Sequence, residues 1–221
     1  MEWLGSAIDI FLHLDLHLNA WAEMLGPWLY VVLFLVIFCE TGLVITPYLP
    51  GDSLLFAVGA LAAREGSPLQ IFHVLVLLSV AAILGDTVNY AAGRWIGPKI
   101  FSREDSRLLD KRHLDRARGF YQKYGGKTIV LARFVPIIRT FAPFVAGIGR
   151  MDYPRFVFYN VTGGIFWTSS FLLAGYYFSG LPMVKEQFHY VVLAIIVISI
   201  MPAVFEYWRA TRGNSGSISK A

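Results

Sequence analysis

Apolar stretches of about 20 residues or more recur along the chain, separated by short polar segments. Three of them are long enough to cross a bilayer, because a helix rises about 1.5 Å per residue and the hydrocarbon core is roughly 30 Å thick. We expect these crossing helices at about 69–97, 153–179 and 188–208. The pattern therefore predicts an all-α integral membrane protein.

Two further apolar stretches, at about 28–63 and 128–149, are interrupted near their middle by helix-breaking residues. These residues are Pro47, Pro50, Gly51, Pro136 and Pro143. Each half is too short to cross a bilayer by itself. Irregular backbone at membrane depth is tolerated only where it lines protein or a water-filled cavity. We therefore expect two re-entrant helical hairpins.

The two interrupted stretches also resemble each other, since residues 47–59 can be aligned with residues 136–147 with one gap. If the first hairpin enters from the outer side and the second from the inner side, the two opposed hairpins form an inverted repeat. Their broken tips then meet near the midplane. Such paired Pro/Gly-interrupted segments are the best sequence indication of a transporter's binding site. Chance similarity between two short apolar segments is the alternative explanation.

Polar segments flank this membrane domain, which we place at 26–208. Residues 1–25 have apolar positions every three to four residues, which is typical of an amphipathic helix lying in the membrane interface. The first six residues contain no Lys or Arg, so we expect no cleaved signal peptide. Residues 209–221 are rich in Ser and Gly and are expected to form a disordered cytoplasmic tail.

Composition and charge support the membrane assignment. The 221 residues are 56% hydrophobic and only 15% charged, with a mean hydropathy of +0.56, which excludes a water-soluble globule. Between Lys99 and Lys127, nine basic residues face four acidic ones. By the positive-inside rule the loop 98–127 is cytoplasmic, and we place the C-terminus on the same side. The flanking apolar segments favour an anionic lipid surface over nucleic acid as the partner of this loop.

Four charged residues lie inside the apolar segments, where each costs about 2.5–3.5 kcal/mol on insertion scales. They are Glu40, Asp52, Arg133 and Arg139. A purely structural pair of salt bridges would explain them, but buried ion pairs rarely stabilise a fold better than apolar packing does. We therefore interpret the four residues as functional groups.

Arg133 and Arg139 have Pro136 between them, and their spacing would not place them on one face of a continuous helix. A helix broken at Pro136 can direct both guanidinium groups into one cavity. Planar bidentate donors suit a phosphate group, and free N–H groups at the start of the broken helix add positive potential. The sequence therefore predicts a phosphate-bearing ligand at the arginines, with Glu40 and Asp52 exchanging protons with the two faces of the membrane.

Further polar residues in the crossing helices are candidates for lining or supporting this cavity. They are Asp86, Asn89, Tyr90, Asn160, Thr162, Trp167 and Thr168. Close helix packing and hydrogen bonds between helices explain the same residues equally well. No metal or cofactor is expected, because His13 and His17 lack an accompanying zinc-protease motif. An enzyme acting on lipid phosphates is disfavoured, because no histidine lies beside the buried acids.

Taken in chain order, the motifs resemble those of the bacterial DedA family, part of the VTT superfamily that is also called SNARE-associated Golgi proteins. The resemblance lies in F-C-E-T-G at 38–42, P-x-x-P-G-D-S-L-L-F at 47–56, G-D-x-x-N-Y-x-x-G-R at 85–94, R-F-x-P-x-x-R-T-F-x-P-x-x-A-G at 133–147 and N-x-x-G at 160–163. It extends over nearly the whole chain.

This resemblance implies a bacterial inner-membrane protein with two opposed re-entrant hairpins. Members of the family are implicated in recycling the lipid carrier undecaprenyl phosphate or in translocating phospholipids, with dependence on the proton motive force. The family's essential acidic residues fall on Glu40 and Asp52, and its essential arginines fall on Arg133 and Arg139.

We therefore hypothesise a flippase, dependent on the proton motive force, for undecaprenyl phosphate or a phospholipid. The first alternative is a cation/proton antiporter or small-solute transporter that uses the same acids, with protons or sodium as the coupling ion. The second is a non-transporting membrane assembly factor. The sequence leaves open the lipid, the transport direction and the oligomeric state, a homo-oligomer included.

Overall fold

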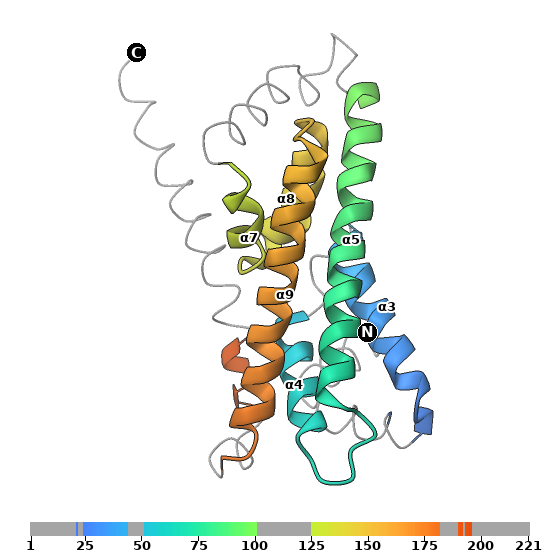
Figure 1. Cartoon of the computed structure of the whole chain (residues 1–221), viewed down its shortest axis with the longest axis vertical. Helices are drawn as coiled ribbons and strands as arrows, with labels where there is room; N and C mark the ends of the chain where they lie inside the picture. The colour runs from blue at the N-terminus through green and yellow to red at the C-terminus, as the bar shows by residue number, and fades with distance from the viewer. Residues whose placement is uncertain are drawn as a thin grey trace, which may run out of the picture.

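The computed structural model describes residues 21, 24–43, 51–100, 125–181, 190–191 and 193–195 (Figure 1). Within these ranges the chain is helical and contains no strand. The helices are α3 (Trp28–Gly42), α4 (Gly51–Ala62), α5 (Ile71–Ile100), α7 (Lys127–Ala132), α8 (Pro136–Ile148) and α9 (Tyr153–Phe178). The predicted interfacial helix, cytoplasmic loop, third crossing helix and tail lie wholly or largely outside the described residues.

The two long helices, α5 and α9, pack against each other and run antiparallel (Figure 1). Their segments Ile71–Gly97 and Tyr153–Phe178 are long and apolar enough to cross a membrane. These segments coincide closely with two of the stretches that the apolar pattern indicated.

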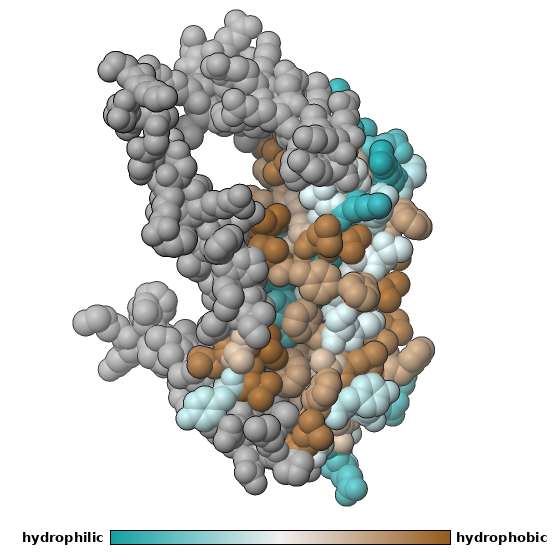
Figure 2. Space-filling view, turned by 90° about the vertical axis from the view of Figure 1, so that its left-hand side faces the viewer, coloured by the Kyte–Doolittle hydropathy of each residue, from teal (hydrophilic) through white to brown (hydrophobic). Residues whose placement is uncertain are grey.

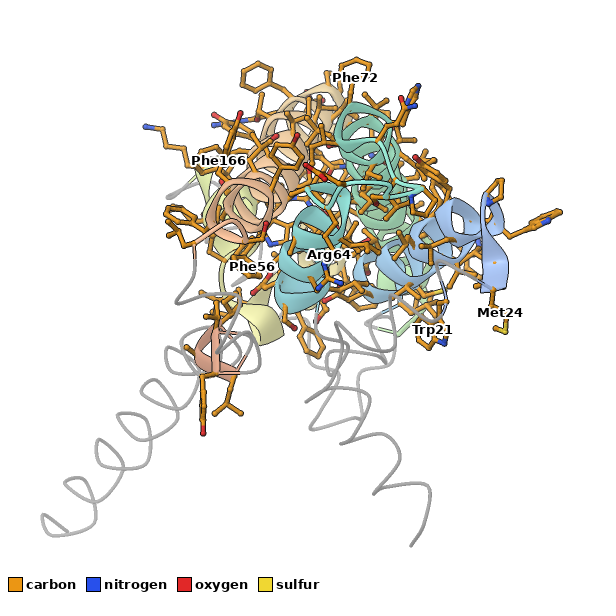
Figure 3. The ribbon with its side chains drawn as sticks, turned by 90° about the horizontal axis from the view of Figure 1, so that it is seen from below. Trp21, Met24, Phe56, Arg64, Phe72 and Phe166 are labelled. Atoms are coloured by element: carbon orange, nitrogen blue, oxygen red, sulfur yellow. The ribbon has the colours of Figure 1, made fainter. Side chains whose placement is uncertain are left out.

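Large apolar side chains cover the outer surface of both long helices. On α5, a stripe of side chains that are each 42% to 48% exposed recurs every four residues: Val76, Val80, Leu84 and Val88. Phe72 of α5 and Phe166 of α9 point away from the bundle (Figure 3). Figure 2 shows apolar side chains over much of the described part of one face. Apolar surface along the length of a helix suits contact with lipid hydrocarbon.

Four short helices form two pairs along the long ones. The pair α3 and α4 lies toward the end where α5 begins, and the pair α7 and α8 lies toward the opposite end (Figure 1). Helix α3 packs on α5 and α4 packs on α9, whereas α8 packs on α5 and α7 packs on α9. Each long helix therefore contacts one short helix from each pair.

Glycines bring α4 and α9 into backbone contact. A Cβ atom at Gly59 would collide with the carbonyl oxygen of Leu172, and one at Gly175 would collide with the carbonyl oxygen of Phe56. The contact thus uses two positions three residues apart on each helix. Small residues at such a crossing permit the close van der Waals packing that drives helix association in lipid.

Helices α5 and α8 meet through the same arrangement. A Cβ atom at Gly147 would collide with the carbonyl oxygen of Tyr90, and one at Gly93 would collide with the carbonyl oxygen of Phe144. The Phe and Gly of α8 have the same spacing as the Phe and Gly that α4 contributes. In both interfaces, therefore, the short helix contributes a Phe and a Gly, and the long helix contributes a Gly.

Hydrogen bonds made by side chains reinforce this packing. The buried hydroxyl groups of Ser79 and Thr168 lie 2.7 Å apart and join α5 directly to α9. The Tyr90 hydroxyl donates to the carbonyl oxygen of Met151 and accepts a hydrogen bond from Arg94. Tyr90 therefore links α5 to the turn between α8 and α9.

The glycine contacts make a direct prediction for stability. Gly175→Ala should force α4 and α9 apart and destabilise the fold by about 1–3 kcal/mol, as overpacking of a close interface does. Thermal unfolding of the detergent-solubilised protein measures the loss. Gly180→Ala is the control, since the nearest atom to a Cβ at that position is 4.0 Å away. An unchanged melting temperature in Gly175→Ala would contradict the close contact.

Candidate functional site

Five charged side chains are buried in the described part of the chain, each at most 5% exposed. They are Glu40, Asp52, Asp86, Arg133 and Arg139. Asp86 lies close to the middle of the span Ile71–Gly97, so the group is at mid-depth of the bundle. Charges at that depth are costly and persist where they are paired with one another and serve a function.

Arg139, near the start of α8, contacts two carboxylates at once. Its Nη1 donates to Oδ1 of Asp52 at 2.7 Å, and its Nη2 donates to Oε1 of Glu40. Glu40 lies near the end of α3 and Asp52 near the start of α4. One guanidinium group therefore ties α8 to both helices of the first pair. Three of the four charged residues that the sequence singled out are in direct contact.

Trp167 of α9 completes this cluster, which we call the Arg139 cluster (Glu40, Asp52, Arg139 and Trp167). Its indole N–H donates to Oδ1 of Asp52 at 2.8 Å, and its ring centroid lies 5.1 Å from Cζ of Arg139. Trp167 is 1% exposed, and a cation–π contact is strongest where water is excluded. The ring therefore orients both the acid and the arginine.

Glu40 also caps the start of α4. Its Oε1 accepts a hydrogen bond of 3.0 Å from the backbone N–H of Gly51. This bond satisfies one of the open N–H groups of the helix and places negative charge at the positive end of its dipole. A Cβ atom at position 51 would collide with the Glu40 carboxylate. Gly51, predicted as a break residue, is the first residue of α4, where it leaves room for Glu40.

Arg133 follows the last residue of α7 and pairs with a different carboxylate. Its Nη2 donates to Oδ2 of Asp86 on α5 and to Oδ1 of Asn160 on α9. Asn160 in turn donates to the carbonyl oxygen of Ile83 at 3.0 Å and to the hydroxyl of Thr87 at 3.2 Å. Arg133 is thus held between the two long helices.

Arg133 and Arg139 have different ion-pair partners, and one cavity that receives both guanidinium groups stays a prediction. Asp86, predicted only as a supporting residue, is the ion-pair partner of Arg133. The two arginines have different partners because the helix breaks at 133–135, after which the chain continues as α8. Helix α7 packs on α9 and α8 packs on α5, so the two arginines belong to helices with different neighbours.

The predicted break residues have different positions. Pro136 begins α8, directly after the break. Pro143 does not interrupt the chain as predicted, because it lies inside α8, which continues to Ile148. A proline removes only one backbone donor, and neighbouring side chains can satisfy carbonyl groups that it frees. Pro47 and Pro50 lie outside the described residues.

Asn89 and Tyr90 are adjacent on α5 but have different surroundings. Asn89 is buried and donates through Nδ2 to the carbonyl oxygens of Thr41 at 3.1 Å and Thr140 at 2.7 Å. Tyr90 instead stacks on Phe156, with ring centroids 4.2 Å apart. Asn89 therefore belongs to the site and Tyr90 does not. The roles of Thr41 and Thr140 could not be foreseen, because every residue carries the carbonyl group they use.

The described buried charges do not cancel, since three carboxylates accompany two guanidinium groups. Arg133 and Asp86 neutralise each other, so the excess negative charge belongs to the Arg139 cluster. Four buried atoms there and nearby have no hydrogen-bond partner: Oε2 of Glu40, Oδ1 of Asn89, and Nε of Arg133 and of Arg139. The site can therefore accept a proton or cation on its acid and donate further hydrogen bonds to an anion. Among the described residues, no group of three His, Cys, Asp or Glu side chains could hold a metal ion.

Comparison with known proteins finds relatives along the whole chain. The VTT domain family model matches residues 49–177. Protein DedA of Escherichia coli K12 is 50% identical over 212 residues, which cover 96% of this chain and 97% of that protein. An uncharacterized membrane protein of Mycobacterium tuberculosis H37Rv is 42% identical over 180 residues, or 81% of this chain and 79% of the relative. Inner membrane protein YqjA of E. coli K12 is 31% identical over 225 residues, or 98% and 100%. No solved structure matches.

The ion pair between Arg133 and Asp86 predicts a pattern of stabilities. Asp86→Asn keeps the shape but leaves an uncompensated buried charge, so it should destabilise the fold by about 3–5 kcal/mol. The double variant Asp86→Asn with Arg133→Gln replaces the ion pair by two neutral amides and should recover most of that loss. Thermal unfolding in detergent compares the three proteins. Equal stability of Asp86→Asn and the unchanged chain would contradict the pairing.

Proposed function

Because the chain belongs to the DedA family of VTT-domain membrane proteins, we propose that it transports a phosphate-bearing lipid across the bacterial inner membrane. The observation that carries this proposal is the Arg139 cluster, in which a buried guanidinium group is held by two acids at mid-depth of the bundle. Ionisable residues inside a membrane mark substrate or proton pathways by default.

In this proposal the two pairs of short helices are opposed re-entrant hairpins that form an inverted repeat. The equivalent Phe and Gly contacts of α4 on α9 and of α8 on α5 support the repeat. The positions of the pairs toward opposite ends of the bundle support the opposed entry (Figure 1). The broken ends of the helices would then form a binding site at the interface of the repeats, as in other transporters built this way.

Exposed charges support an orientation for this arrangement. Arg94, Arg150 and Arg155 are exposed near the end where α5 finishes and α9 begins. At the other end, between α4 and α5, Arg64 is the one exposed Lys or Arg among the described residues. By the positive-inside rule the first end is cytoplasmic, together with the loop 98–127 and the C-terminus.

A phosphate group that binds both Nη atoms of Arg139 must displace Glu40 or Asp52, since the two acids occupy those atoms. An additional anion would increase the excess negative charge in a medium of low dielectric constant, which is unfavourable. Protonation of one acid removes a negative charge and releases the arginine. Proton uptake and phosphate binding therefore favour each other, and this coupling links lipid movement to the proton gradient. The membrane potential adds about 2.3 kcal/mol per elementary charge for each 100 mV.

The substrate class follows from the donors available. Arginine presents a planar fork that binds two phosphate oxygens together, and Nε of Arg139 and of Arg133 is not yet used by any partner. The hydrocarbon tail of the lipid can stay in the bilayer while its headgroup reaches the site. Undecaprenyl phosphate or a phospholipid meets these requirements.

One observation also favours a second function, a cation/proton antiporter. The excess carboxylate of the Arg139 cluster and the unpartnered Oε2 of Glu40 could serve a cation as well as a proton. Ion movement in vesicles whose lipids carry no phosphate would distinguish this function from lipid transport.

Transport in proteoliposomes tests the role of Arg139. We expect Arg139→Ala and Arg139→Lys to slow the translocation of labelled undecaprenyl phosphate by about 10- to 100-fold, the effect of losing a charge-assisted hydrogen bond. Lysine should not rescue, because it cannot bridge two acids or two phosphate oxygens in a plane. Arg155→Ala, at an exposed arginine outside the cluster, is the control and should transport normally. Normal translocation by both Arg139 variants would refute the proposal.

The proposed coupling also predicts how binding depends on pH. Short-chain phosphatidylglycerol keeps a single negative charge between neutral and mildly acidic pH, so any change in its affinity reports on the protein. We expect its affinity to rise as the pH falls, by up to about tenfold per pH unit for one proton taken up. Calorimetry of the detergent-solubilised protein measures it.

Glu40→Gln removes one of the two acids and should flatten this pH dependence. Glu65→Gln, at an exposed acid outside the site, is the matched control and should leave it unchanged. An affinity of the unchanged chain that stays constant with pH would contradict the coupling.

A further inference from the structure

We infer that Asn89 of α5 is a positioning residue that aligns Glu40 with Arg139 by holding the backbone next to each of them. The inference rests on the proposed function of the Arg139 cluster. Asn89 donates no hydrogen bond to either charged group. It acts through Thr41 and Thr140, which directly follow Glu40 and Arg139 in the chain.

The geometry requires a side chain with two N–H donors. Nδ2 of Asn89 donates to the carbonyl oxygen of Thr41 at 3.1 Å and to that of Thr140 at 2.7 Å. Thr41 directly follows Glu40, and Thr140 directly follows Arg139. Because both partners are carbonyl oxygens, only a group with two N–H donors can serve them together.

The carbonyl group of Thr41 lies where a helix leaves its own hydrogen bonding incomplete. Thr41 is in the last turn of α3, where terminal carbonyl groups lack helical partners. Thr140 lies inside α8, directly after Arg139. At membrane depth no water replaces the lost partners, so a neighbouring side chain must do so. Asn89 does this for Thr41, and the same nitrogen atom joins α3 to α8 through Thr140.

Glycine packing on the same face of α5 adds a second constraint. Gly85 is one turn before Asn89, and a Cβ atom at Gly42 would lie 3.2 Å from the Cα atom of Gly85. The end of α3 is therefore fixed against α5 at Gly85 and by the hydrogen bond from Asn89. Helices α3 and α8 belong to different pairs, so any movement of one pair relative to the other must stretch a bond to Asn89.

The other amide atom of Asn89 shows that stability alone does not explain an asparagine at this position. Oδ1 has no hydrogen-bond partner, although the residue is fully buried. Burying an unpaired acceptor costs free energy, and an apolar side chain would avoid that cost. The two N–H contacts therefore account for an asparagine at this position.

Cys39 provides a test that requires no ligand. It is the single cysteine of the sequence, it precedes Glu40, and it is partly buried. We expect Asn89→Leu and Asn89→Asp, which both lose the two N–H donors, to speed alkylation of Cys39 by N-ethylmaleimide about tenfold, roughly the effect of one lost hydrogen bond. The full-length protein in detergent is used.

Ser79→Ala is the matched control. It removes a buried hydrogen bond between α5 and α9 of similar strength and leaves the contacts of Thr41 and Thr140 untouched. We expect it to lower the melting temperature, as the Asn89 variants do, while the alkylation rate stays that of the unchanged chain. If the Asn89 variants are alkylated no faster than Ser79→Ala, the inference is overturned.

Binding of short-chain phosphatidylglycerol separates this inference from the proposed function. Absence of binding by the unchanged chain counts against the function, and the alkylation rates still decide the role of Asn89. If the unchanged chain binds the lipid, the Asn89 variants should shift the pH midpoint of binding and Ser79→Ala should not. A midpoint that is unchanged in the Asn89 variants would overturn the positioning role.

Discussion

The buried charge of Arg139 must be paired with its two acids, and this requirement governs how the short helices are placed. A guanidinium group buried at membrane depth is tolerated only with partners that approach from several directions. Glu40 from α3, Asp52 from α4 and Trp167 from α9 provide them. These contacts fix where the ends of the short helices lie, because each partner is at or near a helix terminus or faces one.

The broken helices and the long helices contribute to the site in different ways. Ends of broken helices expose N–H and carbonyl groups that hydrocarbon cannot satisfy, so side chains such as Glu40 and Asn89 must do so. The long helices supply a frame in which glycines allow backbone contact on both sides of the site. Movement of the short helices against that frame would alter the charge contacts while the outer apolar surface stays in lipid.

The sequence predicted the long helices and the charged residues well, because apolar length and charge within it are local signals. The crossing segments at 69–97 and 153–179 coincide closely with α5 and α9, and the four charged residues are all buried. The pairing was not predictable, because it depends on which helix faces meet. Asp86 pairs with Arg133, which lies 47 positions further along the chain. Pro143 lies inside α8, which tolerates the loss of one backbone N–H donor.

Infrared difference spectroscopy can detect the exchange of an acid for phosphate at Arg139. A short-chain, ether-linked phosphatidylglycerol, which has no ester carbonyl group, is added to the reconstituted protein, and the spectrum reports whether a carboxylate becomes a carboxylic acid. The account predicts a new carbonyl band of a protonated acid that is absent from the double variant Glu40→Gln with Asp52→Asn. Lipid binding to the unchanged chain without any such band would contradict it.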